Sequence, residues 1–262
     1  MKITWTGTAS IRIEADGERL LFDPFVELAG GSNPNRVEDF FSDSDVCITH
    51  GHVDHLFFVP ELVEQADATV HCTHSAAGTL EKYLQDGGNL VLVAPGDSWR
   101  MGRMKITVHR GKHLPFSLRL AGERALRWKR PGRHPLICLR NLLFLAWMHP
   151  GFPEKGETVA YEIDAEGKRI LLLGSMALDG KTAYPDQADL LILPFQGGRD
   201  AVERACDIIG RLRPKNILLS HFDDAFPPVS AEMDTKQLRA RMKEQYPGIR
   251  VVRPRAGKPV HF

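Results

Sequence analysis

Short apolar runs separated by turn residues make up most of the sequence. Residues 3–22 alternate apolar and polar positions around an Ala-Asp-Gly-Glu turn at 15–18, which predicts a β-hairpin or meander. Further strands are predicted at 45–49, 68–71, 90–93, 104–108, 158–163, 169–174, 190–194, 215–221 and 249–253. Helices are predicted at 58–66, 75–84, 200–212 and 234–246. Because strands and helices are interleaved, the sequence indicates an α/β or α+β fold with a mixed sheet.

Residues 115–157 interrupt this alternation and carry no strand signal. An amphipathic helix is expected around residues 118–128, and a nearly all-apolar helix at 136–148, with the breakers PGRHP and HPGFPEKG after them. The second helix has more apolar surface than one sheet contact usually covers. We therefore expect it to form a subunit interface or a lid over the substrate, the alternative being an ordinary core helix.

The same insertion concentrates positive charge. Between residues 110 and 140 a single acidic residue, Glu123, stands against nine basic ones, at positions 110, 112, 119, 124, 127, 129, 130, 133 and 140. Over the whole chain of 262 residues, 34 Lys and Arg balance 33 Asp and Glu. This balance argues against a protein built throughout for nucleic acid or an anionic membrane, so any basic surface is local.

Composition also bears on the compartment. The four cysteines lie far apart without a C-x-x-C pair, which favours a reducing compartment over a disulfide framework. The first residues lack the pattern of a signal peptide, and the apolar run at 136–148 is too short to span a bilayer. We expect a soluble cytoplasmic protein.

The strongest chemical signal is HGHVDH at residues 50–55, directly after the predicted strand at 45–49. Three imidazoles and a carboxylate in six residues are costly to bury unless they bind something. His50 and His52 are two residues apart, so on an extended backbone they face the same side and can share one ion. Asp54 and His55 follow the bend and can face a second ion. Zinc suits these ligands, as do manganese and iron, and each activates bound water.

HGHVDH after an apolar strand resembles the signature of metallo-β-lactamase-fold hydrolases. That resemblance implies an αββα four-layer sandwich with metals at the edge of the sheets, here one domain over residues 1–262 with the helical insertion at about 115–157. Four further stretches resemble the branch of L-ascorbate-6-phosphate lactonase-like hydrolases: MKITWTGTASIRIEADGERLLFDPF, MKITVHRGKH, ADLLILPFQGG and RLRPKNILLSHFDDAFP.

The resemblance also implies roles for individual residues. His50, His52 and His113 match the first metal site, because the family places its third histidine several residues past the strand, beyond His109. Asp54 and His55 match the second metal site, together with His221. Asp23 matches a carboxylate that supports the metal histidines, although it could instead begin an Asp-Pro turn.

Two positions depart from this branch. Gly7-Thr8 stands where the family has Gly-His, and Ser175 stands where it has a bridging aspartate. A neutral hydroxyl cannot offset the charge of two ions, so Ser175, as a substitute at the bridging position, predicts weaker binding of one of them.

The predicted function is metal-dependent hydrolysis of a small anionic lactone or ester, with metal-bound hydroxide as the nucleophile and Asp54 as the catalytic residue that orients it or takes its proton. Zinc is the expected cofactor, one or two per chain. The alternatives are a phosphodiesterase or RNA nuclease of the same fold, and a non-catalytic binding protein with an impaired metal site. Neither a membrane nor nucleic acid is an expected partner, whereas a homo-oligomer through the insertion is. His134 and His149, beside prolines in the insertion, are loop residues or substrate contacts.

Overall fold

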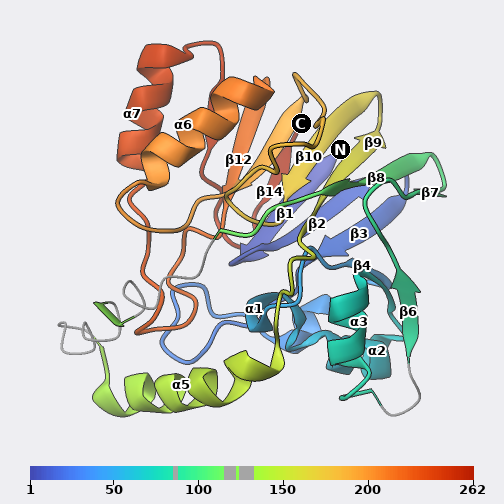
Figure 1. Cartoon of the computed structure of the whole chain (residues 1–262), viewed down its shortest axis with the longest axis vertical. Coiled ribbons are helices and arrows are strands. Elements are labelled where there is room, and N and C mark those ends of the chain that lie inside the picture. Colours follow the sequence, from blue (N-terminus) through green and yellow to red (C-terminus); the bar gives the residue numbers. More distant parts are fainter. Residues whose placement is uncertain (85–87, 115–121, 124–132) are drawn as a thin grey trace.

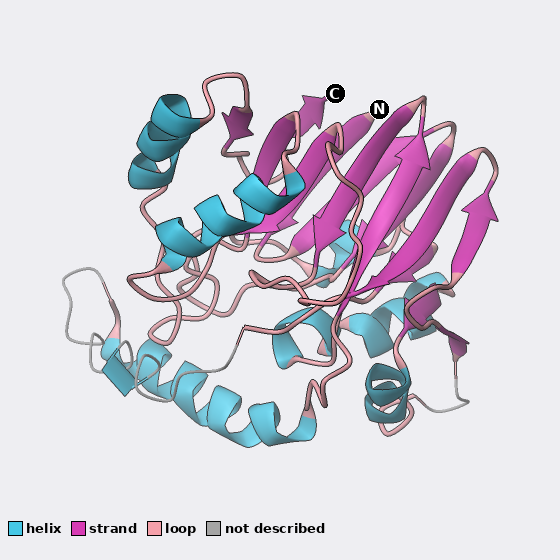
Figure 2. Cartoon of the chain, turned by 45° about the horizontal axis from the view of Figure 1, so that its top comes forward, coloured by secondary structure: helices cyan, strands magenta, loops and turns pink. Residues whose placement is uncertain are grey.

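Two β-sheets packed face to face form the centre of the molecule, and helices cover the outer face of each (Figures 1 and 2). The structure is a computed structural model that describes residues 1–84, 88–114, 122–123 and 133–262. The predicted mixed α/β sandwich of four layers is confirmed. Each sheet contains seven strands, in the orders β14-β1-β2-β3-β4-β5-β6 and β13-β12-β11-β10-β9-β8-β7.

The first sheet begins with the predicted meander and continues with parallel strands. Its strands are β1 (Lys2–Gly7), β2 (Ser10–Ala15), β3 (Glu18–Phe22), β4 (Asp45–Cys47), β5 (Thr69–Cys72), β6 (Asn89–Leu92) and β14 (Pro259–His261). The helices α1 (Val53–Leu56), α2 (Val59–Ala66) and α3 (His74–Leu80) pack on its outer face. Pro60 lies in the first turn of α2, where a missing N–H costs nothing.

The second sheet changes from antiparallel to parallel pairing at β10. Its strands are β7 (Ser98–Met101), β8 (Met104–Arg110), β9 (Val159–Ala165), β10 (Lys168–Leu173), β11 (Leu190–Pro194), β12 (Asn216–Ser220) and β13 (Arg250–Val252). Outside it lie α6 (Ala201–Leu212) and α7 (Lys236–Gln245). The connections between the parallel strands β11, β12 and β13 therefore run through helices, as crossovers between parallel strands usually do.

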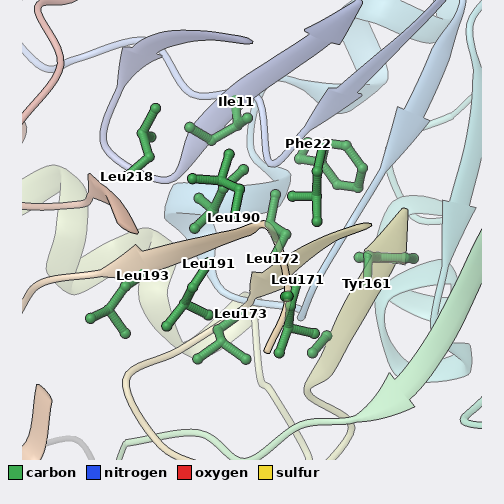
Figure 3. Close-up of a cluster of buried hydrophobic side chains, with 14 of the residues drawn as sticks. Ile11, Phe22, Tyr161, Leu171, Leu172, Leu173, Leu190, Leu191, Leu193 and Leu218 are labelled. Carbon is green, nitrogen blue, oxygen red and sulfur yellow. The ribbon is translucent and has the colours of Figure 1, made fainter. Parts of the chain in front are cut away.

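Apolar side chains from both sheets fill the space between them. Figure 3 shows Leu172 and Leu190 on the side of Ile11 and Phe22, whereas Leu191 points the opposite way. This alternation follows from the two-residue period of a strand and lets one strand serve both the inner core and the helix layer. The hydroxyl of Tyr161 on β9 donates to the carbonyl of Ile48 over 2.8 Å, which ties the second sheet to the end of β4.

Three elements differ from the sequence prediction. The residues Ser98–Met101, predicted as part of a turn, pair with β8 as β7, and the C-terminal residues Pro259–His261 pair with β1. Helix α1 is also absent from the prediction, because its four residues overlap the histidine motif. Short edge elements of this kind depend on tertiary pairing more than on local propensity.

The insertion contains α5 (Pro135–Met148), close to the predicted 136–148, followed by a 3-10 turn (His149–Gly151). In Figure 1, α5 runs across one end of the sandwich. The other helix predicted for the insertion falls largely outside the described residues. No helix in the described ranges has both the length and the apolar character needed to cross a bilayer.

Candidate metal centre

The histidine motif occupies the loop between the end of β4 and the start of α1. His52 has extended backbone angles (φ −72°, ψ 157°) and precedes the first turn of α1, so the chain bends between His52 and Asp54. Gly51 packs against the backbone of Pro153: a Cβ at position 51 would lie 2.7 Å from the Pro153 carbonyl oxygen. The loop is thus held between the first sheet and the segment that follows α5.

Three histidines form the first group. The ligand nitrogens of His50, His52 and His113 all lie within 4.8 Å of one another, and the ring centroid of His113 is 4.7 Å from that of His50 and 4.4 Å from that of His52. Burial lowers the pKa of His50 well below its ordinary range and that of His52 to about 4, and it also lowers the pKa of His113. All three imidazoles are therefore neutral at pH 7, the form that binds a metal.

A chain of hydrogen bonds fixes the tautomer of His50. The hydroxyl of Thr49 donates to Asp23 Oδ2 over 2.7 Å, because a carboxylate can only accept. The same hydroxyl lies 3.0 Å from His50 Nδ1 and must accept from it, so the ring proton of His50 is on Nδ1. The lone pair of His50 is then on Nε2, a buried atom that has no hydrogen-bond partner among the described residues. An orphaned imidazole nitrogen beside two other imidazoles fits a metal ligand.

The second group consists of Asp54, His55 and His221, whose ligand atoms also lie within 4.8 Å of one another. Asp54 Oδ2 is 3.0 Å from His221 Nε2 and 3.7 Å from His55 Nε2. Burial by itself would raise the pKa of Asp54, but the adjacent imidazoles of His55 and His221 outweigh it and hold that pKa well below the ordinary value. Asp54 is therefore an ionised carboxylate at neutral pH.

Asp23 contacts both groups, His50 through Thr49 and His55 directly. Its Oδ2 lies 3.0 Å from His55 Nδ1, and its Oδ1 accepts the backbone N–H of Thr49 over 2.8 Å. Burial alone would lower the pKa of His55, but Asp23 and Asp54 raise it. Since Nδ1 of His55 donates a hydrogen bond to Asp23, Nε2 of His55 faces Asp54 and the second group. This is the contact expected of a carboxylate that orients a ligand histidine.

Ser175 lies at the end of β10, and its role as a bridging substitute stays a prediction. Its buried Oγ accepts the backbone N–H of Leu114 over 3.1 Å. Gly174 before it allows the strand end to approach Thr49, because a Cβ there would lie 2.5 Å from Thr49 Cβ. Ser175 thereby anchors the loop that carries His113, a contact that the sequence does not reveal.

Other histidines and one further carboxylate have contacts or positions of their own outside the two groups. His109 pairs with Glu162 (2.6 Å), His71 stacks on Trp99 at 4.4 Å between ring centroids, and His134 precedes α5. Asp223 accepts the backbone N–H of Thr8 at 2.8 Å. By contrast, the ring centroid of His149, just after α5, lies 5.7 Å from that of His52.

Comparison with known proteins identifies the family of the chain. The family model of the beta-lactamase superfamily domain matches residues 2–221, which include all six candidate ligands. The chain belongs to the metallo-β-lactamase superfamily. Superfamily relatives include a UPF0173 metal-dependent hydrolase from Methanopyrus kandleri, 39% identical over 70 residues. That match covers 27% of this chain and 30% of the relative, so the chain aligns with less than half of the relative's length.

Two solved structures share the superfamily fold over nearly their whole length. Igni18, a metallo hydrolase from Ignicoccus hospitalis, has a TM-score of 0.65 and 19% identity, with 99% of this chain and 97% of that chain covered. An isothiocyanate hydrolase from Delia radicum gut bacteria has a TM-score of 0.62 and 18% identity, with coverage of 100% and 99%. At these identities the likeness establishes the fold.

Proposed function

We propose that this chain is a metal-dependent hydrolase that acts on a small anionic lactone or ester. The observation that carries the proposal is the orphaned, buried Nε2 of His50, held towards two neutral imidazoles by the Asp23–Thr49 relay. A purely structural histidine cluster would bury an unpaired nitrogen at a cost of about 1–3 kcal/mol. A bound cation removes that cost.

The two groups differ in the ions that they suit. His50, His52 and His113 offer three neutral nitrogens, the donor set that holds zinc with one position left open. Asp54, His55 and His221 offer one carboxylate and two nitrogens, which zinc, manganese or iron accept. One or two zinc ions per chain is therefore the proposed cofactor content.

Ions bound there would activate water and polarise a substrate oxygen. Asp54 supports this chemistry as the only carboxylate among the six candidate ligands. The side chain of Asp54 is 16% exposed. As an ionised group it can orient a water molecule or hold its proton. In their neutral forms, His50 and His55 carry the ring proton on Nδ1, towards Thr49 and Asp23, so that Nε2 can bind an ion.

An anionic substrate is supported by charge. Five imidazoles surround a single carboxylate in the two ligand groups, so bound ions would leave the site positive. The excess of basic residues between 110 and 140, a feature of the sequence, favours the same kind of substrate. Similarity to the lactonase-like branch favours a phosphorylated or carboxylated lactone or ester. The same charge favours a phosphodiester, including RNA, as the second candidate.

A cytoplasmic location is also proposed. All four cysteines are free thiols in the structure, and three of them, Cys47, Cys72 and Cys138, are buried. Unpaired buried thiols are typical of proteins that function in a reducing compartment.

The test combines metal content with turnover of three probes: dihydrocoumarin for lactones, p-nitrophenyl acetate for esters and bis-p-nitrophenyl phosphate for phosphodiesters. We expect bound zinc, manganese or iron, and turnover of the lactone or ester that His52→Ala with Asp54→Ala abolishes while the fold is retained. His113→Ala should behave like this double variant. His109→Ala, on the strand that leads to His113 but paired with Glu162, should keep metal and turnover.

Each outcome supports one of the three candidate functions. Wild-type turnover in the double variant would overturn the hydrolase proposal. Phosphodiester turnover alone, with strongly salt-dependent nucleic-acid binding, would select the second candidate. A protein that binds metal without turning over any probe would be a binding protein.

A further inference from the structure

A further histidine, His149, lies beside the first ligand group. It follows the last residue of α5, and its ring makes an angle of 34° with that of His52 at 5.7 Å between centroids. It falls outside the set of nitrogens within 4.8 Å that His50, His52 and His113 form. His149 is also exposed, whereas His50 is buried. This imidazole therefore borders the first group on its solvent-accessible side.

Buried neighbours hold His149 in place. Met148 before it is 6% exposed, and Phe152 after it is 2% exposed. Phe152 packs against Phe57 and Tyr83, with ring centroids at 6.1 Å and 5.6 Å. The backbone that carries the exposed His149 side chain is therefore anchored on both sides, which reduces the freedom lost when a ligand binds.

The segment after this turn packs against the loop that carries the histidine motif. Gly51 leaves room for the carbonyl of Pro153, whose oxygen would lie only 2.7 Å from a Cβ at position 51. Glu154 is the acidic residue nearest to His149 in sequence. Its carboxylate accepts the N–H groups of Gly156 and Thr158 at 2.8 Å and 3.0 Å, within its own loop. The charge of Glu154 also acts on His113, so this side of the site combines imidazoles with one carboxylate whose oxygens accept local N–H groups.

We propose that His149 is a substrate-contacting residue, which donates a hydrogen bond to a phosphate or carboxylate oxygen of a substrate held at the first group. This proposal rests on the proposed function and specifies how the insertion takes part in it. A ring N–H is a donor that an anionic oxygen accepts well, and such bonds are among the stronger ones in proteins. The helix α5 would then set specificity through the residue that directly follows it.

The experiment measures anion binding separately from turnover. Zinc-loaded wild type, His149→Ala, His149→Gln and His134→Ala are titrated with inorganic phosphate, and then with acetate, by calorimetry. His134 is the matched control, because it precedes α5 at the opposite end. We expect His149→Ala to weaken phosphate binding about tenfold, the effect of one hydrogen bond to a charged group. His149→Gln keeps an N–H donor and should recover part of the loss, and His134→Ala should stay within about twofold of wild type.

Zinc content and acetate binding show the cause of any loss of phosphate affinity in His149→Ala. Equal zinc in His149→Ala and wild type is expected. Equal phosphate affinity in the two proteins would overturn the proposal, as would zinc loss matching that of His52→Ala, or a zinc-loaded wild type that binds neither anion. Acetate binding that depends on His149 without phosphate binding would assign the contact to carboxylates. If anion binding depends on His149 but no probe is hydrolysed, the contact stands and the hydrolase function fails.

Discussion

Ser175 departs most from the lactonase-like pattern at the scale of single residues. Its hydroxyl accepts the N–H of Leu114 at 3.1 Å and, as a neutral group, brings no negative charge to the predicted bridging position. Two dications facing five imidazoles and one carboxylate repel each other with little compensation. We therefore expect fewer than two tightly bound ions per chain as purified, with the first group keeping its ion.

Ser175→Asp tests this expectation. An added carboxylate should raise metal affinity at the second group about tenfold or more, which calorimetric titration with zinc will measure. Ser175→Ala is the control, since it removes the acceptor for Leu114 without adding charge and should loosen the His113 loop. Two equally tight ions in the wild type, or no gain in the Asp variant, would show that another group fills the bridging role.

Glu27 predicts a pH dependence of stability. It is buried, and burial together with a hydrogen bond to Asp223 raises its pKa to about 8 from an ordinary value near 4.5. The folded state therefore holds a proton that the unfolded state releases above pH 4.5, so stability falls as pH rises from about 4.5 to about 8.

Glu27→Gln should remove this loss. Between pH 5 and pH 8 the wild type is expected to lose at least about 1 kcal/mol more stability than the variant, the equivalent of about one pKa unit. Urea unfolding at both pH values measures the difference. Glu61→Gln, an exposed acid on α2, is the control and should follow the wild type. Parallel pH curves for Glu27→Gln and the wild type would contradict the buried-acid interpretation.

At the scale of elements, the metal loop depends on a close backbone approach. A methyl group at Gly51 would meet the Pro153 carbonyl oxygen at 2.7 Å, and backbone on both sides cannot yield as a flexible side chain does. Gly51→Ala should therefore displace the loop, lower stability by about 1–3 kcal/mol and weaken zinc binding.

Gly78→Ala provides a control of opposite sign. Gly78 lies inside α3 and is exposed, and a Cβ at position 78 would have no heavy atom within 4 Å in the described part of the chain. Alanine there should stabilise the protein by up to about 1 kcal/mol through helix propensity. Thermal unfolding and zinc titration of both variants provide the comparison. Unchanged zinc affinity in Gly51→Ala would mean that the loop adapts independently of the Pro153 segment.

At the scale of the whole molecule, α5 has an apolar face that the described residues leave exposed. Leu136, Leu139, Leu143 and Trp147 share one side of the helix and are 70%, 51%, 64% and 78% exposed. A contiguous apolar stripe of this kind usually marks an interaction surface. We expect a second copy of the chain to cover it, as the composition of the insertion suggests.

Leu143→Glu should therefore convert a dimer to a monomer in light scattering without loss of folding, because Leu143 has an exposed side chain. Leu92→Glu, on the edge strand β6 and 57% exposed, is the control. A monomeric wild type would contradict the subunit interface. The exposed face of α5 would then be assigned to a lid over the substrate.

The sequence alone determined the order of strands and helices and the residue types of the site, and the family resemblance of HGHVDH implied the four layers. Alternating and continuous apolar runs predict strands and helices because their periods, 2 and 3.6, come from backbone geometry that is local. HGHVDH predicted two ligand groups for the same local reason. His50 and His52 lie on an extended stretch and face one side, whereas Asp54 and His55 follow the bend and face another.

The contacts between distant segments were decided by the tertiary structure. His113, His221 and Ser175 follow strands that are near neighbours in one sheet, whereas β7 and β14 exist because another strand is available to pair with them. The Thr49 relay to Asp23, the Leu114 contact of Ser175 and the approach of His149 to His52 join residues from 26 to 97 positions apart. Such contacts follow from the packing of the two sheets and of α5, which no local pattern encodes.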